Sequence, residues 1–199
     1  MAYDIKNIEN AIPEANKQYF FDANVWLIIL KPSIDLKPYE KHYINFFEKI
    51  IDWQEANPPK IVINSLVISE VINAYLRNQF DVWKAEIIRK TPENNLKEAK
   101  ELQFKKDFRI TPEYEQALKD CKNDLLAYKE FCINIDNLKE PDDLWRIIKE
   151  TPSNSDFNDY FYYEMALDFK FSIVTNDRDF LFSGVEILSA NNKLLKHSF

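Results

Sequence analysis

Glycine is almost absent from this 199-residue sequence, which contains Gly184 and no other. A GxxxxGK phosphate-binding loop and a GxGxxG dinucleotide-binding turn each need several glycines, because only glycine lets the backbone approach the ligand closely enough. The composition therefore excludes both of these nucleotide-binding sites.

Histidine and cysteine are nearly as scarce as glycine. The chain has two of each, His42, His197, Cys121 and Cys132. It therefore lacks a CxxC pair, an HExxH helix and a zinc-binding cluster of these residues, so that any chemistry must run mainly on carboxylates. Two isolated cysteines and a charged N-terminal segment favour a cytoplasmic location.

Long apolar runs are missing as well. The longest one, Val25 to Leu30, has six residues, whereas a helix needs about 20 to cross a bilayer. The sequence therefore predicts no membrane span.

Short apolar runs alternate with helical patterns along the chain. Strands are expected at 19–21, 61–63, 131–135, 171–175 and 185–188, and helices at 39–53, from 65, from 112, at 143–149 and at 157–170. Strands that alternate with helices form a parallel sheet that is covered on both faces. The sequence predicts an α/β fold with three layers, α/β/α, around a central and mostly parallel sheet, in a single domain over residues 1–199.

Carboxylates follow two of the predicted strands. Asp22 closes the first strand, and Asp177 and Asp179 come just after the strand that ends at Thr175. Sites in open parallel sheets form at the carboxyl ends of the strands, because loops and helix N-termini converge there. Asp22 taken alone also suits a helix N-cap, so its assignment to a site depends on the other acids.

Two further acids fall on helix faces that are otherwise apolar. Glu70 shares a face with Leu66 and Ala74, and Asp159 shares a stripe with Tyr162. A carboxylate that faces a core is costly unless a partner neutralises it, and hard cations such as Mg²⁺ prefer oxygen ligands. The pattern predicts a cage of carboxylates around a divalent cation.

Four short segments carry these acids in a recognisable order. They are Phe21-Asp22-Ala23-Asn24-Val25, Ser69-Glu70, Asn158-Asp159 and Val174-Thr175-Asn176-Asp177-Arg178-Asp179-Phe180. Together they resemble the PIN-domain nucleases, including the VapC-type toxins. The resemblance implies a set of catalytic and metal-binding acids, Asp22, Glu70, Asp159 and Asp177. It also implies supporting groups, Asn24 and Thr175, and two additional candidate ligands, Asp156 and Asp179.

The same resemblance implies a function. It points to a metal-dependent phosphodiesterase with Mg²⁺ or Mn²⁺ as cofactor, an endoribonuclease that acts on an RNA substrate and leaves 5′-phosphate and 3′-hydroxyl ends. It further implies the toxin of a toxin–antitoxin pair, blocked by a small antitoxin protein. A structure-specific DNA nuclease stays open, as does an inactive PIN-like module that binds RNA or a protein, although four acidic positions disfavour the latter. The oligomeric state is open too, a homodimer included.

Residues 78–110 form a polar helical excursion from this pattern. Within 84–109 there are eight basic and five acidic residues, a local charge of +3 in a chain of net charge −7. An acidic total ordinarily argues against a nucleic-acid partner, because phosphate contacts come from Lys and Arg. The excursion supplies candidates for such contacts, Lys100, Lys105, Lys106 and Arg109. A solvated helical face fits the same charge pattern.

Overall fold

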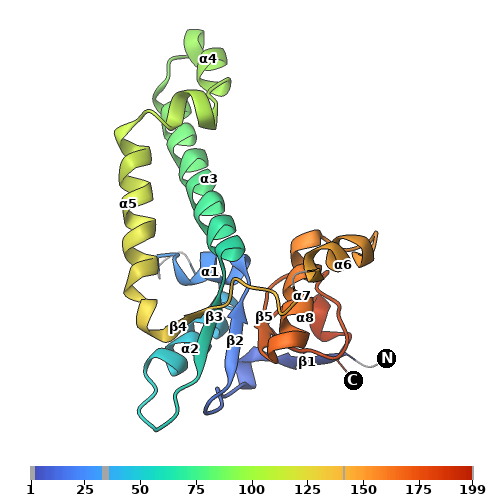
Figure 1. The fold of residues 1–199 in the computed structure, drawn as a ribbon. Helices are drawn as coiled ribbons and strands as arrows, with labels where there is room; N and C mark the ends of the chain where they lie inside the picture. The colour runs from blue at the N-terminus through green and yellow to red at the C-terminus, as the bar shows by residue number, and fades with distance from the viewer. Residues whose placement is uncertain (1–2, 33–35, 141, 199) are drawn as a thin grey trace. The chain divides into compact units, whose positions relative to one another are not determined.

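The computed structural model describes residues 3–32, 36–140 and 142–198, and the chain forms two compact units (Figure 1). The sheet unit comprises Met1–Val67 and Phe131–Phe199 in their described parts, and the hairpin unit comprises Ile68–Glu130. A single PIN-like domain over residues 1–199 therefore stays a prediction. The excursion at 78–110 falls within the hairpin unit.

A parallel sheet forms the centre of the sheet unit. Its six strands lie in the order β1-β6-β5-β2-β3-β4, and every neighbouring pair is parallel. The strands are β1 (Asp4–Asn7), β2 (Gln18–Phe21), β3 (Lys60–Ile63), β4 (Cys132–Asn134), β5 (Ser172–Val174) and β6 (Glu186–Ser189). The five predicted strands are confirmed as β2 to β6. The sequence missed β1, an edge strand whose one buried residue, Ile5, leaves little hydrophobic signal.

Helices cover both faces of this sheet, as the fold class predicts. The helices of the sheet unit are η1 (Ile8–Asn10), α1 (Ala23–Ile29), α2 (Glu40–Ile51), α6 (Asp143–Glu150), α7 (Phe157–Phe169) and α8 (Asn192–Leu195). Successive side chains of a strand point to opposite faces. On β2, Phe21 contacts Phe47 of α2 with ring centroids 5.9 Å apart, whereas Phe20 contacts Tyr162 of α7 at 4.6 Å. The central strand is therefore packed between two helical layers.

The strand order reverses beside β2. The chain runs from β2 to β3 and β4 on one side, and it returns to β5 and β6 on the other side. Phe21 pairs with Val174, so the carboxyl ends of β2 and β5 lie next to each other. A crevice outside the strand ends at such a reversal is where open α/β sheets bind their ligands.

The hairpin unit consists of two long helices and a short helical connection. Its elements are α3 (Ser65–Lys90), which begins in the sheet unit, then η3 (Glu93–Asn95), α4 (Leu96–Lys100), η4 (Phe104–Phe108) and α5 (Pro112–Ala127); η5 (Lys129–Phe131) follows. Figure 1 shows α3 and α5 side by side, with α4 at the end where they are joined. No break marks the expected start of the excursion at residue 78, because α3 continues unbroken to Lys90.

Within the described part of the chain, no helix is both long enough and apolar enough to span a bilayer. The expectation from the short apolar runs agrees with this finding.

Candidate functional site

Asp22 is a buried carboxylate at the junction of β2 and α1. It is 6% exposed and caps α1, where its Oδ1 accepts a 2.6 Å hydrogen bond from the backbone N–H of Ala23. Its Oδ2 accepts hydrogen bonds from the Asn24 side-chain amide and from the Thr175 hydroxyl, the latter at 2.7 Å. The N-cap role and the predicted site role therefore belong to the same side chain.

Thr175 connects the two strand ends at this point. Its side chain is fully buried, and its Oγ1 both donates to Asp22 and accepts a 3.0 Å hydrogen bond from the backbone N–H of Asp177. The Asn24 side chain adds a second link, since its Oδ1 accepts from the backbone N–H of Asn176 at 3.0 Å. The predicted supporting residues, Asn24 and Thr175, thus hold the loop after β5 against the N-terminus of α1.

Asp177 belongs to the tight turn that follows Thr175. It is half-buried, and its Oδ1 accepts a 2.9 Å hydrogen bond from the backbone N–H of Asp179. The carboxylate of Asp179 is exposed and forms an ion pair with Arg178 at 3.2 Å. Of these two acids, Asp177 is therefore the one tied to Asp22 through Thr175.

Tyr43 of α2 holds the loop after β5 through contacts that the sequence did not reveal. Its buried hydroxyl lies 3.1 Å from the backbone oxygen of Thr175 and 3.1 Å from Oδ1 of Asn176, and it accepts a 2.8 Å hydrogen bond from the N–H of Ala190. Burial raises the pKa of this phenol, so it stays protonated as a donor. Its place on the apolar stripe of α2 suggested only a core residue, and a hydroxyl within that stripe was the available signal.

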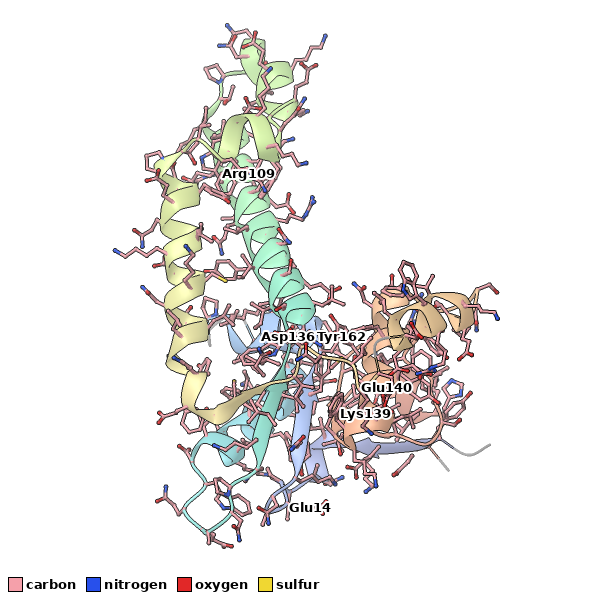
Figure 2. All side chains as sticks on the ribbon, viewed as in Figure 1. Glu14, Arg109, Asp136, Lys139, Glu140 and Tyr162 are labelled. Carbon is pink, nitrogen blue, oxygen red and sulfur yellow. The ribbon has the colours of Figure 1, made fainter. Side chains whose placement is uncertain are left out.

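A third carboxylate at a strand end, that of Asp136, has a structural role. Asp136 lies just beyond β4 (Figure 2), where it accepts hydrogen bonds from the backbone N–H of Ser65 at 2.5 Å and from the Asn134 side chain at 2.7 Å. These hydrogen bonds lower its pKa. Asn64, 3% exposed, accepts from the backbone N–H of Val67. Together they hold the first turn of α3 at the end of β3.

The remaining predicted acids lie on helices. Asp156 is the exposed N-cap of α7, and Asp159 is half-buried in the first turn of that helix. Glu70 is half-buried on α3, in the hairpin unit. No three Asp, Glu, His or Cys side chains of the described residues are grouped so that they could hold a metal ion. Among the residues that it describes, the structure therefore does not show the expected cage as an assembled group.

A comparison with known families finds a match over most of the chain. The PIN domain family matches residues 19–184. This chain belongs to the PIN domain family. The match runs from β2 to the loop before β6, so it includes Asp22, Glu70, Asp159 and Asp177. PIN domains are generally nucleases that use divalent metal ions, so the family indicates hydrolase chemistry on a nucleic-acid substrate.

Two other comparisons add little to this assignment. The chain is similar to the crystal structure of PAE2754 from Pyrobaculum aerophilum, with 15% identity, a TM-score of 0.47, and coverage of 92% of this chain and 90% of that one. A comparison with curated proteins gives no match.

Proposed function

We propose that this PIN domain is a metal-dependent phosphodiesterase that cleaves RNA internally. One observation supports this most directly: a buried carboxylate, Asp22, lies at the strand-order reversal, and one hydroxyl connects it to the turn that carries Asp177. Parallel sheets bind ligands at this point. The membership of the chain in a family of nucleases makes a phosphodiester the expected substrate.

The donor set suits a hard cation. Carboxylate oxygens of Asp22 and Asp177 and the hydroxyl of Thr175 are the kinds of atoms that bind Mg²⁺ or Mn²⁺, and no thiol or imidazole takes part in the set. Asp22 and Asp177 would hold the ion, with Glu70 and Asp159 as the further proposed ligands. Asp156 and Asp179 are weaker candidates, because both are exposed and Asp179 also pairs with Arg178.

Each group of the site has a separate role in the proposed reaction. When bound, the cation supplies an activated water and offsets negative charge on the phosphate. Thr175 and Asn24 keep Oδ2 of Asp22 in one orientation by donating to it. Tyr43 fixes the loop that carries Asp177, and Asp177 would hold the ion together with Asp22.

The test is cleavage of a mixed RNA pool by wild type and by Asp22→Asn, in EDTA and in millimolar Mg²⁺ or Mn²⁺. Wild type should produce internal cuts with 5′-phosphate ends only when metal is present. Asp22→Asn should lose orders of magnitude in rate, because it removes a negative ligand. It should still fold, since Asn is as good an N-cap as Asp. Normal cleavage by this variant would overturn the assignment.

Thermal melting separates a catalytic site from an inactive module. A metal that binds only the folded protein adds about 2.7 kcal/mol of stability at 100 times its Kd. Wild type should therefore melt higher in Mn²⁺ than in EDTA, and Asp22→Asn should lose most of this gain. An unchanged midpoint in wild type, together with no cleavage of RNA, would favour the inactive binding module. Cleavage of branched DNA but not of RNA would favour the structure-specific DNA nuclease.

A toxin role with a dedicated antitoxin stays a prediction from the family resemblance, as does a homodimer. Controlled expression of wild type and of Asp22→Asn in a bacterial host tests the toxin role. Growth arrest by wild type alone supports it, and equal growth of the two strains contradicts it.

A further inference from the structure

The hairpin unit contains an aromatic cluster of its own. It consists of Phe80 and Trp83 of α3, Phe104 and Phe108 of η4, and Tyr114 of α5. Phe108 is 1% exposed, and its ring centroid lies 5.2 Å from that of Trp83 and 5.6 Å from that of Tyr114. These rings hold the short π-helical turn η4 against the two long helices.

Two arginines stack on one ring at the surface of this cluster. The guanidinium of Arg77 lies 5.6 Å from the Phe104 centroid, and that of Arg109 lies 5.3 Å from it. Figure 2 labels Arg109 beside α3 within the hairpin unit. A guanidinium on an aromatic face is restrained in orientation, while its N–H groups stay available at the edge for a phosphate. Both arginines are exposed, so their free N–H groups can be reached from solvent.

Among the described residues, these cations form no ion pair with an acidic side chain. Among the described residues, ion pairs near the junction of α3 and η3 involve Glu86 with Arg89 and Lys90. Arg77, Lys100, Lys105, Lys106 and Arg109 form no ion pair with any residue that the structure describes. Asp107, which lies between Lys106 and Phe108, instead accepts a 2.7 Å hydrogen bond from the backbone N–H of Gln103.

We propose that this part of the hairpin unit binds the phosphodiester backbone of a single-stranded nucleic acid. Arg77 and Arg109 serve as the stacked contacts, and Lys105 and Lys106, both exposed on η4, serve as additional phosphate contacts. Lys100, exposed on α4, is a further candidate for a phosphate contact. The proposal rests on the proposed nuclease function, for which it supplies substrate affinity, and it adds Arg77 to the cations that the sequence suggested.

The test compares two triple variants with the same change of charge in the same unit. The first is Lys105→Glu with Lys106→Glu and Arg109→Glu. The control is Lys119→Glu with Lys122→Glu and Lys129→Glu, three exposed lysines on and after α5. Binding of 20-nucleotide single-stranded RNA and DNA is measured in EDTA at several salt concentrations, so that no cleavage occurs.

The first variant should bind at least tenfold more weakly than the control. Its plot of log K against log salt should be shallower by about 2, because each lost phosphate contact removes about 0.7 from the slope. Equal affinities and slopes for the two triple variants would overturn the proposal. So would failure of wild type to bind either oligonucleotide, which would leave an acidic protein as the partner of this surface. The RNA and DNA arms show which backbone is preferred.

A second variant isolates the stacking and keeps every charge. Arg77→Lys with Arg109→Lys should bind roughly fivefold more weakly at an unchanged salt slope, because lysine lacks the flat guanidinium. Wild-type affinity in this variant would overturn the stacked arrangement. Metal-dependent cleavage is measured separately. If the first triple variant loses oligonucleotide binding but keeps the Mn²⁺-induced melting shift, its defect lies in the hairpin surface and not in the metal site. Normal cleavage by Asp22→Asn would instead contradict the proposed nuclease site and leave the binding result standing.

Discussion

The hydroxyl of Thr175 donates a 2.7 Å hydrogen bond to the carboxylate of Asp22, although the two residues are 153 positions apart in the chain. The same oxygen accepts from the N–H of Asp177. One buried atom thus fixes both Asp22 and the turn that carries Asp177, the first and last acids of the proposed site. A change at Thr175 should therefore affect both the proposed metal site and the stability of the fold.

Replacing Thr175 by valine tests this relationship. Val keeps the shape but removes the donor to Asp22 and the acceptor for the Asp177 N–H. We expect a loss of about 1–3 kcal/mol in the free energy of unfolding. Mn²⁺ affinity and cleavage should each fall 10- to 100-fold, as is usual when a group that orients a ligand is lost. Thr175→Ser retains the hydroxyl and should stay near wild type. Equal Mn²⁺ titrations for the Val and Ser variants would contradict the positioning role.

Tyr43→Phe removes the hydroxyl that holds the loop after β5. The buried backbone oxygen of Thr175 and the N–H of Ala190 then lose a partner, which should cost about 1–3 kcal/mol of stability. In single-turnover cleavage we expect a lower rate constant with little change in RNA affinity. The control is Tyr39→Phe, at the N-cap of α2, whose ring contacts Lys37. If both variants cleave alike, the Tyr43 hydroxyl does not position the site.

Single substitutions of the remaining predicted acids test which of them bind the metal. Glu70→Gln and Asp159→Asn should each reduce the Mn²⁺-induced melting shift and cleavage by an order of magnitude or more, because each removes a proposed ligand charge. Asp156→Asn should cleave nearly as wild type, because this exposed acid is a weaker candidate ligand, and it should fold, since Asn replaces Asp well as the N-cap of α7. Asp179→Asn should do the same, because it loses only an exposed ion pair with Arg178. The opposite ranking would reassign the metal ligands.

Glu186 gives the fold a specific acid sensitivity. Burial alone would raise its pKa, but hydrogen bonds from Lys17, Lys6 and Ser172 outweigh burial and lower it from 4.5 to about 2. A carboxyl with a depressed pKa in the folded state stabilises the fold above its unfolded pKa, and this stabilisation disappears as the pH falls from about 4.5 to 2. The shift corresponds to roughly 3 kcal/mol at most.

Urea unfolding of wild type and Glu186→Gln at pH 7 and at pH 3 measures this contribution. The variant should be less stable at pH 7, and the difference between the two proteins should shrink at pH 3. A difference that is independent of pH would show that Glu186 acts through packing instead of charge.

The sequence by itself determined the layered α/β fold and the order of its central elements. The apolar runs at 19–21, 61–63 and 171–175 are short and closed by polar residues, so local pattern sufficed to find β2, β3 and β5. Because strand ends carry sites in such sheets, the same pattern singled out Asp22 and Asp177. By contrast, β1 contains one buried residue and pairs with β6 from the far end of the chain, which no local pattern reveals.

Only the tertiary structure decided which polar atoms and rings meet. The contacts of Thr175 with Asp22, of Tyr43 with the loop after β5, and of Arg77 with Phe104 join residues that are distant in the sequence, through single atoms or ring faces. Periodicity reports which face of a helix or strand is buried, but it does not report which polar atom on that face meets a partner. Those pairings arise from the strand order and the packing of helices on the sheet, and these are properties of the folded chain as a whole.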